Sequence, residues 1–122
     1  MTESTRRIIQ QIRAVPKGRV SCYRDIALKA GLPNGARQTV RVLHSMSEKY
    51  ALPWHRIVRS NGSIALEEGA GKELQISLLR AEGVEVSPQG RVDMKRFGVL
   101  PQKIPRKYIT QRHRDRKSAE EE

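Results

Sequence analysis

The chain has 122 residues, enough for one domain with a buried core and too few for two. Lys and Arg number 24 against 13 Asp and Glu, and the resulting formal charge of +11 favours a polyanionic partner such as nucleic acid. No apolar run approaches the roughly 18 residues that cross a bilayer, and no leader pattern opens the chain, so we expect a cytoplasmic protein without a membrane anchor. The single cysteine, Cys22, excludes an internal disulfide and a cysteine-rich zinc site, and no cofactor or metal is expected.

The first half of the chain predicts three helices. Residues 3–14 place three isoleucines on one face and arginines on the other, as in an amphipathic helix. Ser21 is a candidate N-cap for a second helix over residues 22–30, which Gly31 would end in a left-handed conformation. A third helix is predicted from residue 36 to about residue 48.

The second and third predicted helices form a helix-turn-helix. A four-residue connection, residues 32–35, contains Pro and Gly and is short enough to hold the helices at a fixed angle. In this motif the later helix reads the nucleic acid. Val40, Leu43 and Ser47 share one face of that helix.

The middle of the chain carries a hairpin signal. Residues 56–59 and 63–66 flank Ser-Asn-Gly, which tolerates the positive φ angles of tight hairpin turns. A two-stranded wing after a helix-turn-helix predicts an α/β, mostly helical, winged helix-turn-helix fold with a small β-hairpin wing.

One more firm helix is predicted over residues 72–82, ended by Gly83. Residues 84–86 and 91–92 are expected to be extended around a Pro-Gln-Gly turn, and Asp93 to cap a last single helical turn. The side chains expected to point inward from the helix are Leu74, Leu78, Leu79 and Ala81.

The composition changes after residue 100. Residues 103–117 hold seven Lys or Arg against one Asp, and three Glu end the chain. Too few apolar side chains occur there to bury a core, so we expect a basic, disordered tail that contacts phosphates without reading sequence.

Residues 52–58, Leu-Pro-Trp-His-Arg-Ile-Val, contain the only Trp of the chain with a His beside it. Pro53 stiffens the backbone before Trp54 and His55, and Ile57 begins a stretch with the β-branched character of a buried strand. Such a turn can hold an aromatic wall and an imidazole in fixed geometry. The alternative on spacing alone is a core Trp beside a satisfied His.

Motifs spread over residues 4–86 resemble the C-terminal domain of O6-alkylguanine-DNA alkyltransferases. They are Val15-Pro16-x-Gly18-x-Val20-x-x-Tyr23-x-x-Ile26-Ala27, Gly35-Ala36-Arg37, Pro53-Trp54-His55-Arg56-Ile57-Val58 and Leu78-Leu79-x-x-Glu82-Gly83. In the active transferases the residue between Pro and His is a nucleophilic cysteine, whereas Trp54 stands here. That change, with the 90–98 segment, resembles the alkyltransferase-like proteins, which bind alkylated DNA without repairing it. We therefore expect a DNA-binding domain over residues 1–100, while the tail, residues 101–122, lies outside the resemblance.

An indole cannot replace the thiolate of a transferase. The lone pair of the Trp54 ring nitrogen belongs to the π system, so the ring offers a donor N–H and no nucleophile. The flat ring can instead pack against a purine or an alkyl group, which predicts a non-enzymatic pocket that recognises the lesion. The predicted pocket residues are Pro53, Trp54, His55 and Ile57.

The resemblance also implies roles in DNA binding. Tyr23 would press on the phosphate beside the target nucleotide, and Arg37 would fill the space in the base stack. Gly35 and Ala36 would keep the helix slim for approach to the minor groove. His55 and Glu82 match the relay that activates the transferase cysteine and would remain as a structural pair. The predicted DNA-binding set is Tyr23, Arg24, Gly35, Ala36, Arg37, Gln38 and His44.

Several positions depart from the family pattern. Val40 replaces a common Gly, Met46 falls at the usual hinge Asn, and Ala65-Leu66 replaces Gly-Tyr. The change at Ala65-Leu66, with the short loop over residues 67–71, implies a smaller lid that admits larger alkyl groups.

The resulting hypothesis is a monomeric, nucleoid-associated protein that flips O6-alkylguanine out of duplex DNA and marks it for nucleotide excision repair proteins. Two alternatives stay open. Cys22 near a helix N-terminus could be a relocated alkyl acceptor, although its place beside Ile26 favours a core residue. A winged-helix transcription regulator reading a fixed site is the other.

Overall fold

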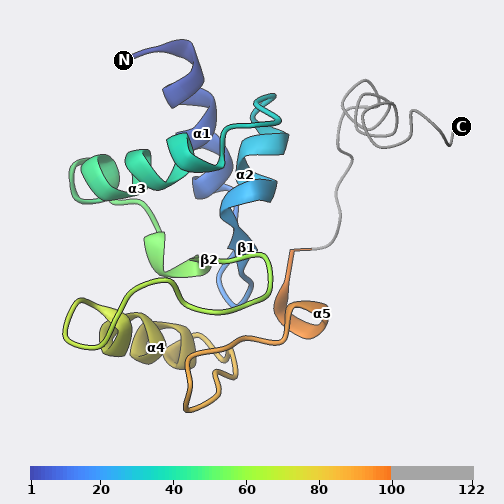
Figure 1. Cartoon of the computed structure of the whole chain (residues 1–122), viewed down its shortest axis with the longest axis vertical. Coiled ribbons are helices and arrows are strands. Elements are labelled where there is room, and N and C mark those ends of the chain that lie inside the picture. The colour runs from blue at the N-terminus through green and yellow to red at the C-terminus, as the bar shows by residue number, and fades with distance from the viewer. Residues whose placement is uncertain (100–122) are drawn as a thin grey trace, which may run out of the picture.

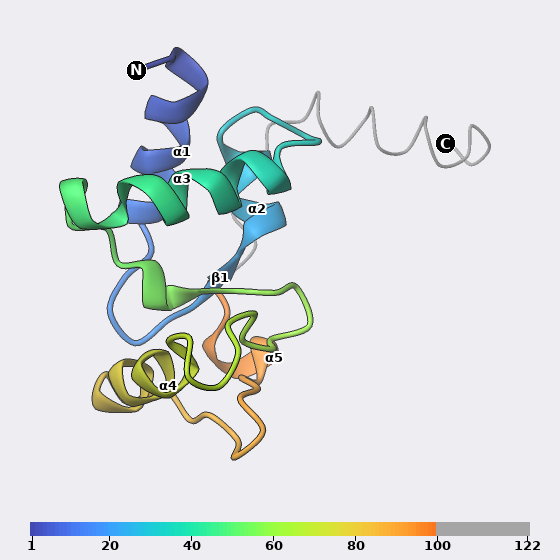
Figure 2. The same ribbon diagram turned by 60° about the vertical axis from the view of Figure 1, so that its left-hand side comes forward.

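A computed structural model describes residues 1–99, which form two layers of helices around a short pair of strands (Figure 1). Three helices lie on one side of the strands and the remaining helices on the other, as the turned view also shows (Figure 2). No helix within the described residues is long and apolar enough to cross a membrane. The elements are α1 Glu3–Arg13, β1 Ser21–Cys22, α2 Tyr23–Lys29, α3 Ala36–Tyr50, the 3-10 helix η1 Trp54–Arg56, β2 Ile57–Val58, α4 Lys72–Ala81 and α5 Met94–Phe97.

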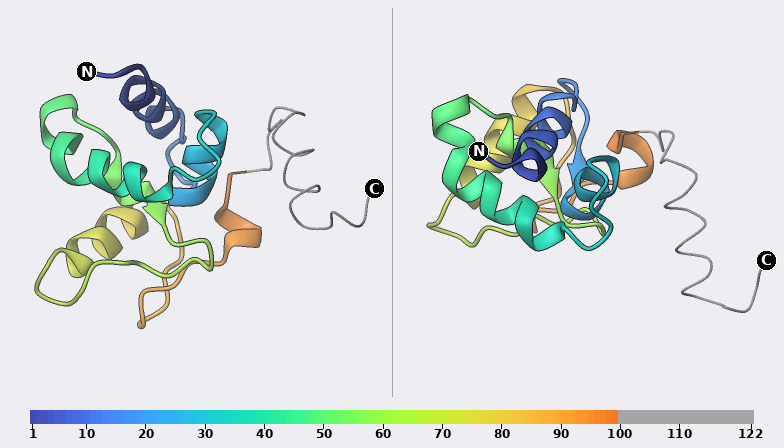
Figure 3. Two further views of the ribbon diagram at one scale, coloured as in Figure 1. Left: turned by 45° about the horizontal axis from the view of Figure 1, so that its top comes forward. Right: turned by 90° about the horizontal axis from the view of Figure 1, so that it is seen from above.

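The first layer consists of α1, α2 and α3 around one apolar cluster. The Thr2 hydroxyl caps α1 by accepting a hydrogen bond from the Thr5 N–H at 3.1 Å. The isoleucines of α1 are buried, as their spacing predicts, and contact residues of all three helices. Seen from above, α3 runs along the outside of this group (Figure 3).

The helix-turn-helix prediction is confirmed in α2 and α3. Gly31 follows α2 with φ +82°, and the N–H of Leu32 donates to the carbonyl of Ala27 at 2.8 Å. Gly35 is buried in this turn, and its expected role in DNA approach stays a prediction. A Cβ on Gly35 would lie 2.8 Å from the Cβ of Leu32, so glycine is needed for the packing of the turn. The third helix continues two residues beyond the predicted end, to Tyr50.

Ser21 does not cap the second helix, which corrects the prediction. It pairs in parallel with Ile57, and Cys22 pairs with Val58, to form the β1–β2 sheet between the layers. Cys22 occupies the N-cap position of α2 and makes no side-chain hydrogen bond there. Sheet pairing between distant segments therefore overrides the local preference of Ser for capping.

The second layer packs α4 against the sheet and the later loops. Its apolar cluster comprises Val20, Val58, Ile64, Leu79, Val84, Val86 and Val92. The predicted inward face of this helix is partly wrong: Leu79 is fully buried, but the Leu74 residue is 55% exposed and Ala81 is exposed. Gln75 is buried in their place, for a reason that lies in the site described below.

The hairpin prediction is right about the turn and wrong about the pairing. The N–H of Arg59 donates to the carbonyl of Ser63 at 2.9 Å, and Gly62 takes φ +91°. Beyond the turn, Ser63 forms an antiparallel bridge with Arg91, not with the 56–59 segment. A Cβ on Gly62 would collide with the carbonyl oxygen of Val92, so glycine allows this close approach.

The end of the described chain agrees with the sequence patterns. Val86 and Val92 form an antiparallel bridge, and the Asp93 side chain accepts from the N–H of Lys95 at 2.9 Å to cap α5. The predicted basic tail, residues 101–122, lies outside the described residues.

Candidate functional site

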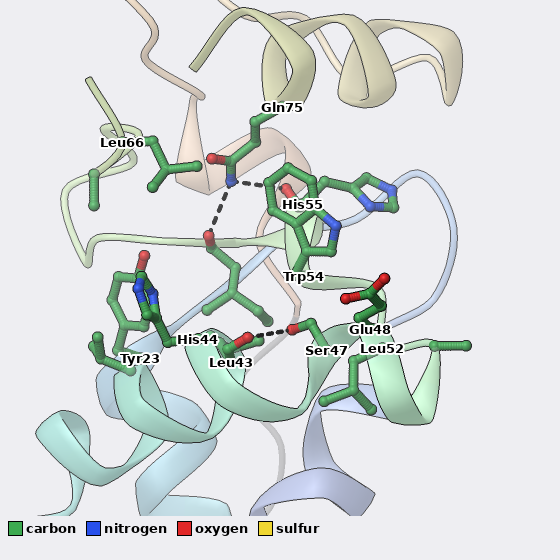
Figure 4. Close-up of a pocket in the computed structure, with 14 residues that line it drawn as sticks. Tyr23, Leu43, His44, Ser47, Glu48, Leu52, Trp54, His55, Leu66 and Gln75 are labelled. Carbon is green, nitrogen blue, oxygen red and sulfur yellow. Dashed lines mark hydrogen bonds between the residues drawn. The ribbon is translucent and has the colours of Figure 1, made fainter. Parts of the chain in front are cut away.

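A pocket of about 860 Å³ opens between the two layers, which is the size of a typical small-molecule site. Its floor and walls come from α3, η1, α4 and the segment that follows β2, with Trp54 projecting into the middle (Figure 4). The lining residues are Tyr23, Val40, Leu43, His44, Ser47, Glu48, Ala51, Leu52, Trp54, His55, Ile57, Ala65, Leu66 and Gln75.

The turn that carries Trp54 is held by hydrogen bonds on both sides. The Trp54 N–H donates to the Leu52 carbonyl at 2.8 Å. The buried Gln75 of α4 donates both hydrogens of its side-chain amide, to the carbonyls of His55 and Ile57, each at 3.1 Å. These bonds explain why a polar side chain is buried in α4, and they fix the backbone on either side of the pocket wall.

His55 is fixed from two directions. Its ring meets the Trp54 ring edge-on, with centroids 6.1 Å apart and an interplanar angle of 84°. The imidazole Nε2 lies 2.9 Å from Oε2 of Glu82, so the contact that the resemblance implied is present.

Glu82 has a stronger partner that sequence reasoning missed. Arg56 donates to Oε2 at 2.7 Å through Nη2 and to Oε1 at 3.0 Å through Nε, in a bidentate pair. The Gly18 N–H also donates to Oε1 at 3.3 Å. The Arg56 guanidinium, helped by His55, lowers the pKa of Glu82 from 4.5 to about 2 despite partial desolvation. The carboxylate is therefore charged at neutral pH and organises this side of the site.

Arg56 and Gln75 are the main residues absent from the predicted site. Arg56 stands within the Pro-x-His-Arg motif, and that position was a usable signal. Gln75 carried no signal of its own, because a polar residue in a helix is ordinarily exposed. Its role depends on the distance between α4 and η1, which only the folded chain defines.

The structure brings some predicted site residues together and separates others. Tyr23 and His44 line the pocket with Trp54, His55 and Ile57, while Pro53 precedes η1 as its N-cap. Burial raises the pKa of the Tyr23 phenol, opposed by the nearby Arg59 cation, so the hydroxyl remains a hydrogen-bond donor. Pro53, predicted as a pocket residue, and Glu82 are not part of the pocket lining. The other predicted residues outside the lining are Arg24 and Arg37, both exposed, together with Gly35, Ala36 and Gln38.

The alternative that made Cys22 an alkyl acceptor is contradicted. Cys22 is 3% exposed and does not line the pocket. Burial raises the pKa of its thiol, whereas a nucleophile needs a lowered one. Among residues 1–99, moreover, no three His, Cys, Asp or Glu side chains are placed to hold a metal ion.

Replacing Glu82 with Gln should destabilise the fold and remove part of its acid sensitivity. A carboxylate whose pKa falls from 4.5 to about 2 on folding stabilises the native state above pH 4.5, and this stabilisation is lost as pH falls towards 2. We expect Glu82→Gln to lower the free energy of unfolding by roughly 2–4 kcal/mol at pH 7, since Arg56 loses its anionic partner. Denaturant unfolding from pH 7 to 2 measures both effects.

Glu85→Gln is the matched control, because Glu85 pairs with Arg96 at 2.7 Å but its side chain is 70% exposed. It should change stability little. An acid-dependent loss of stability as steep in Glu82→Gln as in wild type would contradict the assigned role of Glu82.

The DNA-binding domain of 6-O-methylguanine DNA methyltransferase is the family model that matches this chain, over residues 3–84. The DNA base-flipping protein of Escherichia coli K12 is 43% identical over 91 residues, covering 75% of this chain and 70% of that protein. Alkyltransferase-like protein 1 of Schizosaccharomyces pombe is 33% identical over 87 residues, covering 70% of this chain and 81% of that protein.

A solved structure agrees with these sequence relationships. The S. pombe Atl1 complex with damaged DNA containing O6-carboxymethylguanine superposes with a TM-score of 0.73 at 29% identity, covering 83% of this chain and 98% of that one. Its fold and this one therefore share nearly all of the described elements. With Trp54 between Pro53 and His55, the chain belongs to the 6-O-methylguanine DNA methyltransferase DNA-binding family and, within it, to the alkyltransferase-like proteins.

Proposed function

We propose that this protein binds O6-alkylguanine in duplex DNA, flips the nucleotide into the pocket and performs no chemistry on it. The observation that carries the proposal is the position of Trp54. The ring projects into a pocket of about 860 Å³ from a turn held at both ends, where the family's transferases have their reactive thiol. Most of the other lining side chains are apolar, which suits a base with an alkyl substituent.

The absence of transfer chemistry follows from the residues available. Alkyl transfer by displacement needs a nucleophile at the alkyl carbon, and the Trp54 indole has no free lone pair. The single cysteine of the chain is buried outside the pocket lining. The relatives named as a DNA base-flipping protein and an alkyltransferase-like protein support binding without repair.

The exposed side of α3 is the proposed DNA-docking surface. Arg37 lies exposed in its first turn, where a long planar cation can enter the base stack as a nucleotide leaves. Tyr23 lies at the start of α2 and lines the pocket, so the DNA strand would pass between Arg37 and the pocket. We assign this face to the minor groove, with Arg24, Ala36, Gln38 and His44 as flanking contacts.

We further infer a place for the protein in a repair sequence. A binder that cannot remove the lesion must hand it to enzymes that excise the damaged strand, and bacterial nucleotide excision repair has that chemistry. We propose that the protein acts as a monomer at the nucleoid, since one pocket and one reading helix suffice for one lesion. This proposal rests on chemistry and on the family relationship.

Binding to matched duplexes tests the function. Affinity should be higher for a duplex with one O6-methylguanine than for the same duplex with guanine, and the ratio should persist across unrelated flanking sequences. A transcription regulator would instead follow the flanking sequence. A duplex carrying a labelled methyl group should leave no label on the protein, whereas stoichiometric labelling would overturn the non-enzymatic proposal.

Trp54→Ala should preserve the fold but reduce the preference for alkylated over normal guanine. Removing the ring removes about 1–3 kcal/mol of stacking, while contacts to the phosphates persist. Trp54→Phe is the control, because it keeps an aromatic wall and should keep most of the preference. The measurement is the ratio of dissociation constants for the two duplexes, with thermal unfolding to verify the fold. If Trp54→Ala has the same ratio of dissociation constants as wild type, Trp54 serves only in packing and not in lesion recognition.

The Trp54→Cys variant separates binding from chemistry. It places a thiol next to His55, whose contact with Glu82 is intact. A thiol needs its general base within about 3 Å, and a pocket shaped around an indole need not hold the new thiol that close to His55. We expect little or no methyl transfer. Rapid transfer would mean that one residue separates this protein from an enzyme.

Arg37→Ala should weaken binding to the lesion duplex by about 1–3 kcal/mol, because the space left by the flipped base would lose its hydrogen bonds. Arg41→Ala is the matched control: Arg41 is also exposed on α3, one turn further from its N-terminus. It should affect lesion and normal duplexes alike. If Arg37→Ala and Arg41→Ala lose the same affinity for the lesion duplex and for the normal duplex, Arg37 acts only as a phosphate contact.

Removing residues 101–122 should lower affinity for damaged and undamaged DNA by the same factor. Seven Lys or Arg lie in this segment, and contacts to phosphate release counterions without reading the base. The logarithmic dependence of affinity on salt should become less steep than in the full chain. A loss confined to damaged DNA would contradict this and place part of the lesion recognition in the tail.

A further inference from the structure

The pocket lining contains a single carboxylate. Among the described residues that line it, Glu48 is the carboxylate, and no Lys or Arg is present. We propose that Glu48 determines specificity: it makes the pocket favour neutral or cationic O6-substituents and disfavour anionic ones such as carboxymethyl. This inference deepens the proposed function and rests on it.

Glu48 is placed to act on a bound substituent. It lies in the last turns of α3, and Figure 4 shows its carboxylate reaching from this helix towards the Trp54 side of the pocket. Within residues 1–99 it forms no ion pair. The neighbouring Lys49 lies over the Tyr50 ring instead, with its Nζ 5.5 Å from the ring centroid. The charge of Glu48 therefore remains available to a ligand.

The nearest motif cation does not offset that charge. Arg56 donates hydrogen bonds through Nε and Nη2 to Glu82 and through Nη1 to the carbonyl of Val15 at 3.0 Å. Its positive charge is matched by the carboxylate that it contacts, and Arg56 does not line the pocket. His44 and His55 are the other lining residues able to carry charge, and each does so only when protonated.

Two neutral polar groups of the pocket have committed their donors within the protein. The Ser47 hydroxyl donates to the Leu43 carbonyl at 2.6 Å, so it presents acceptor lone pairs to the pocket. Gln75 commits the donors of its side-chain amide to the carbonyls of His55 and Ile57. Tyr23 and Trp54, which also line the pocket, keep a donor O–H and a donor ring N–H. Hydrogen bonding alone therefore does not exclude an anionic substituent, and the discrimination that we propose rests on the charge of Glu48.

We expect Glu48 to change the preference between neutral and anionic substituents only modestly, because it is exposed at the pocket mouth and salt screens its electric field. An anionic group is the informative probe. The Atl1 neighbour was solved with DNA containing O6-carboxymethylguanine, and this chain differs from it at most positions, with 29% identity.

The test compares two isosteric lesions in one duplex: O6-carboxymethylguanine, which is anionic, and O6-carbamoylmethylguanine, which is neutral. Dissociation constants are measured for the full-length wild type, Glu48→Gln and the control Glu85→Gln. Both variants change net charge equally, but Glu85 pairs with Arg96 and lies outside the pocket lining. Glu48 lies near the C-terminal end of α3, where a negative charge is unfavourable, so Glu48→Gln should stay folded.

Wild type should bind the neutral lesion more tightly, and Glu48→Gln should reduce that preference by roughly two- to tenfold, with less reduction at high salt. Glu85→Gln should leave the preference unchanged. Equal preference in wild type and Glu48→Gln overturns the role of Glu48. If wild type prefers neither lesion to guanine, the proposed function itself fails, so the two failures are distinct.

Discussion

The Glu82 carboxylate is the interaction on which the arrangement of the site depends. It accepts hydrogen bonds from Arg56 of η1 and from the Gly18 N–H before β1, and it lies 2.9 Å from Nε2 of His55. Since Glu82 follows α4, this one side chain joins the second layer to the segments that precede β1 and β2. Its pKa near 2 keeps it charged, which maintains all these contacts at neutral pH.

A second tie runs from the same helix. Gln75 holds the carbonyls that flank Arg56, so α4 contacts η1 both through its middle and through its end. The pocket lies between the layers that these contacts join (Figure 4). In a transferase such a scaffold would position a nucleophile; here it positions the ring of Trp54. A rigid wall loses little conformational entropy on binding, which suits a protein whose proposed task is recognition alone.

Positive and negative side chains occupy different parts of the site. Exposed cations such as Arg24, Arg37 and Arg41 lie on or beside the reading helix, while the pocket lining holds Glu48 and no Lys or Arg. We therefore expect long-range attraction to phosphate to come from outside the pocket. Inside the pocket, a bound substituent would meet packing contacts, hydrogen-bonding groups and the negative charge of Glu48. Changes in the pocket are therefore expected to alter discrimination among alkyl groups without altering the general affinity for DNA.

The amino-acid sequence by itself determined the helix-turn-helix, the capped turn at Asp93 and the Trp54 motif, because periodicity, capping residues and an ordered motif are local signals. Tertiary structure alone decided the rest. Ser21 pairs with Ile57 instead of capping α2, Ser63 forms its bridge with Arg91 instead of the 56–59 segment, and Gly35 lies close to Leu32 in the turn. Leu74 faced solvent while Gln75 was buried, and Arg56 joined Glu82 across 26 positions of the chain. Each outcome depends on which distant segment of the chain packs against the residue, and a local sequence pattern does not specify that segment.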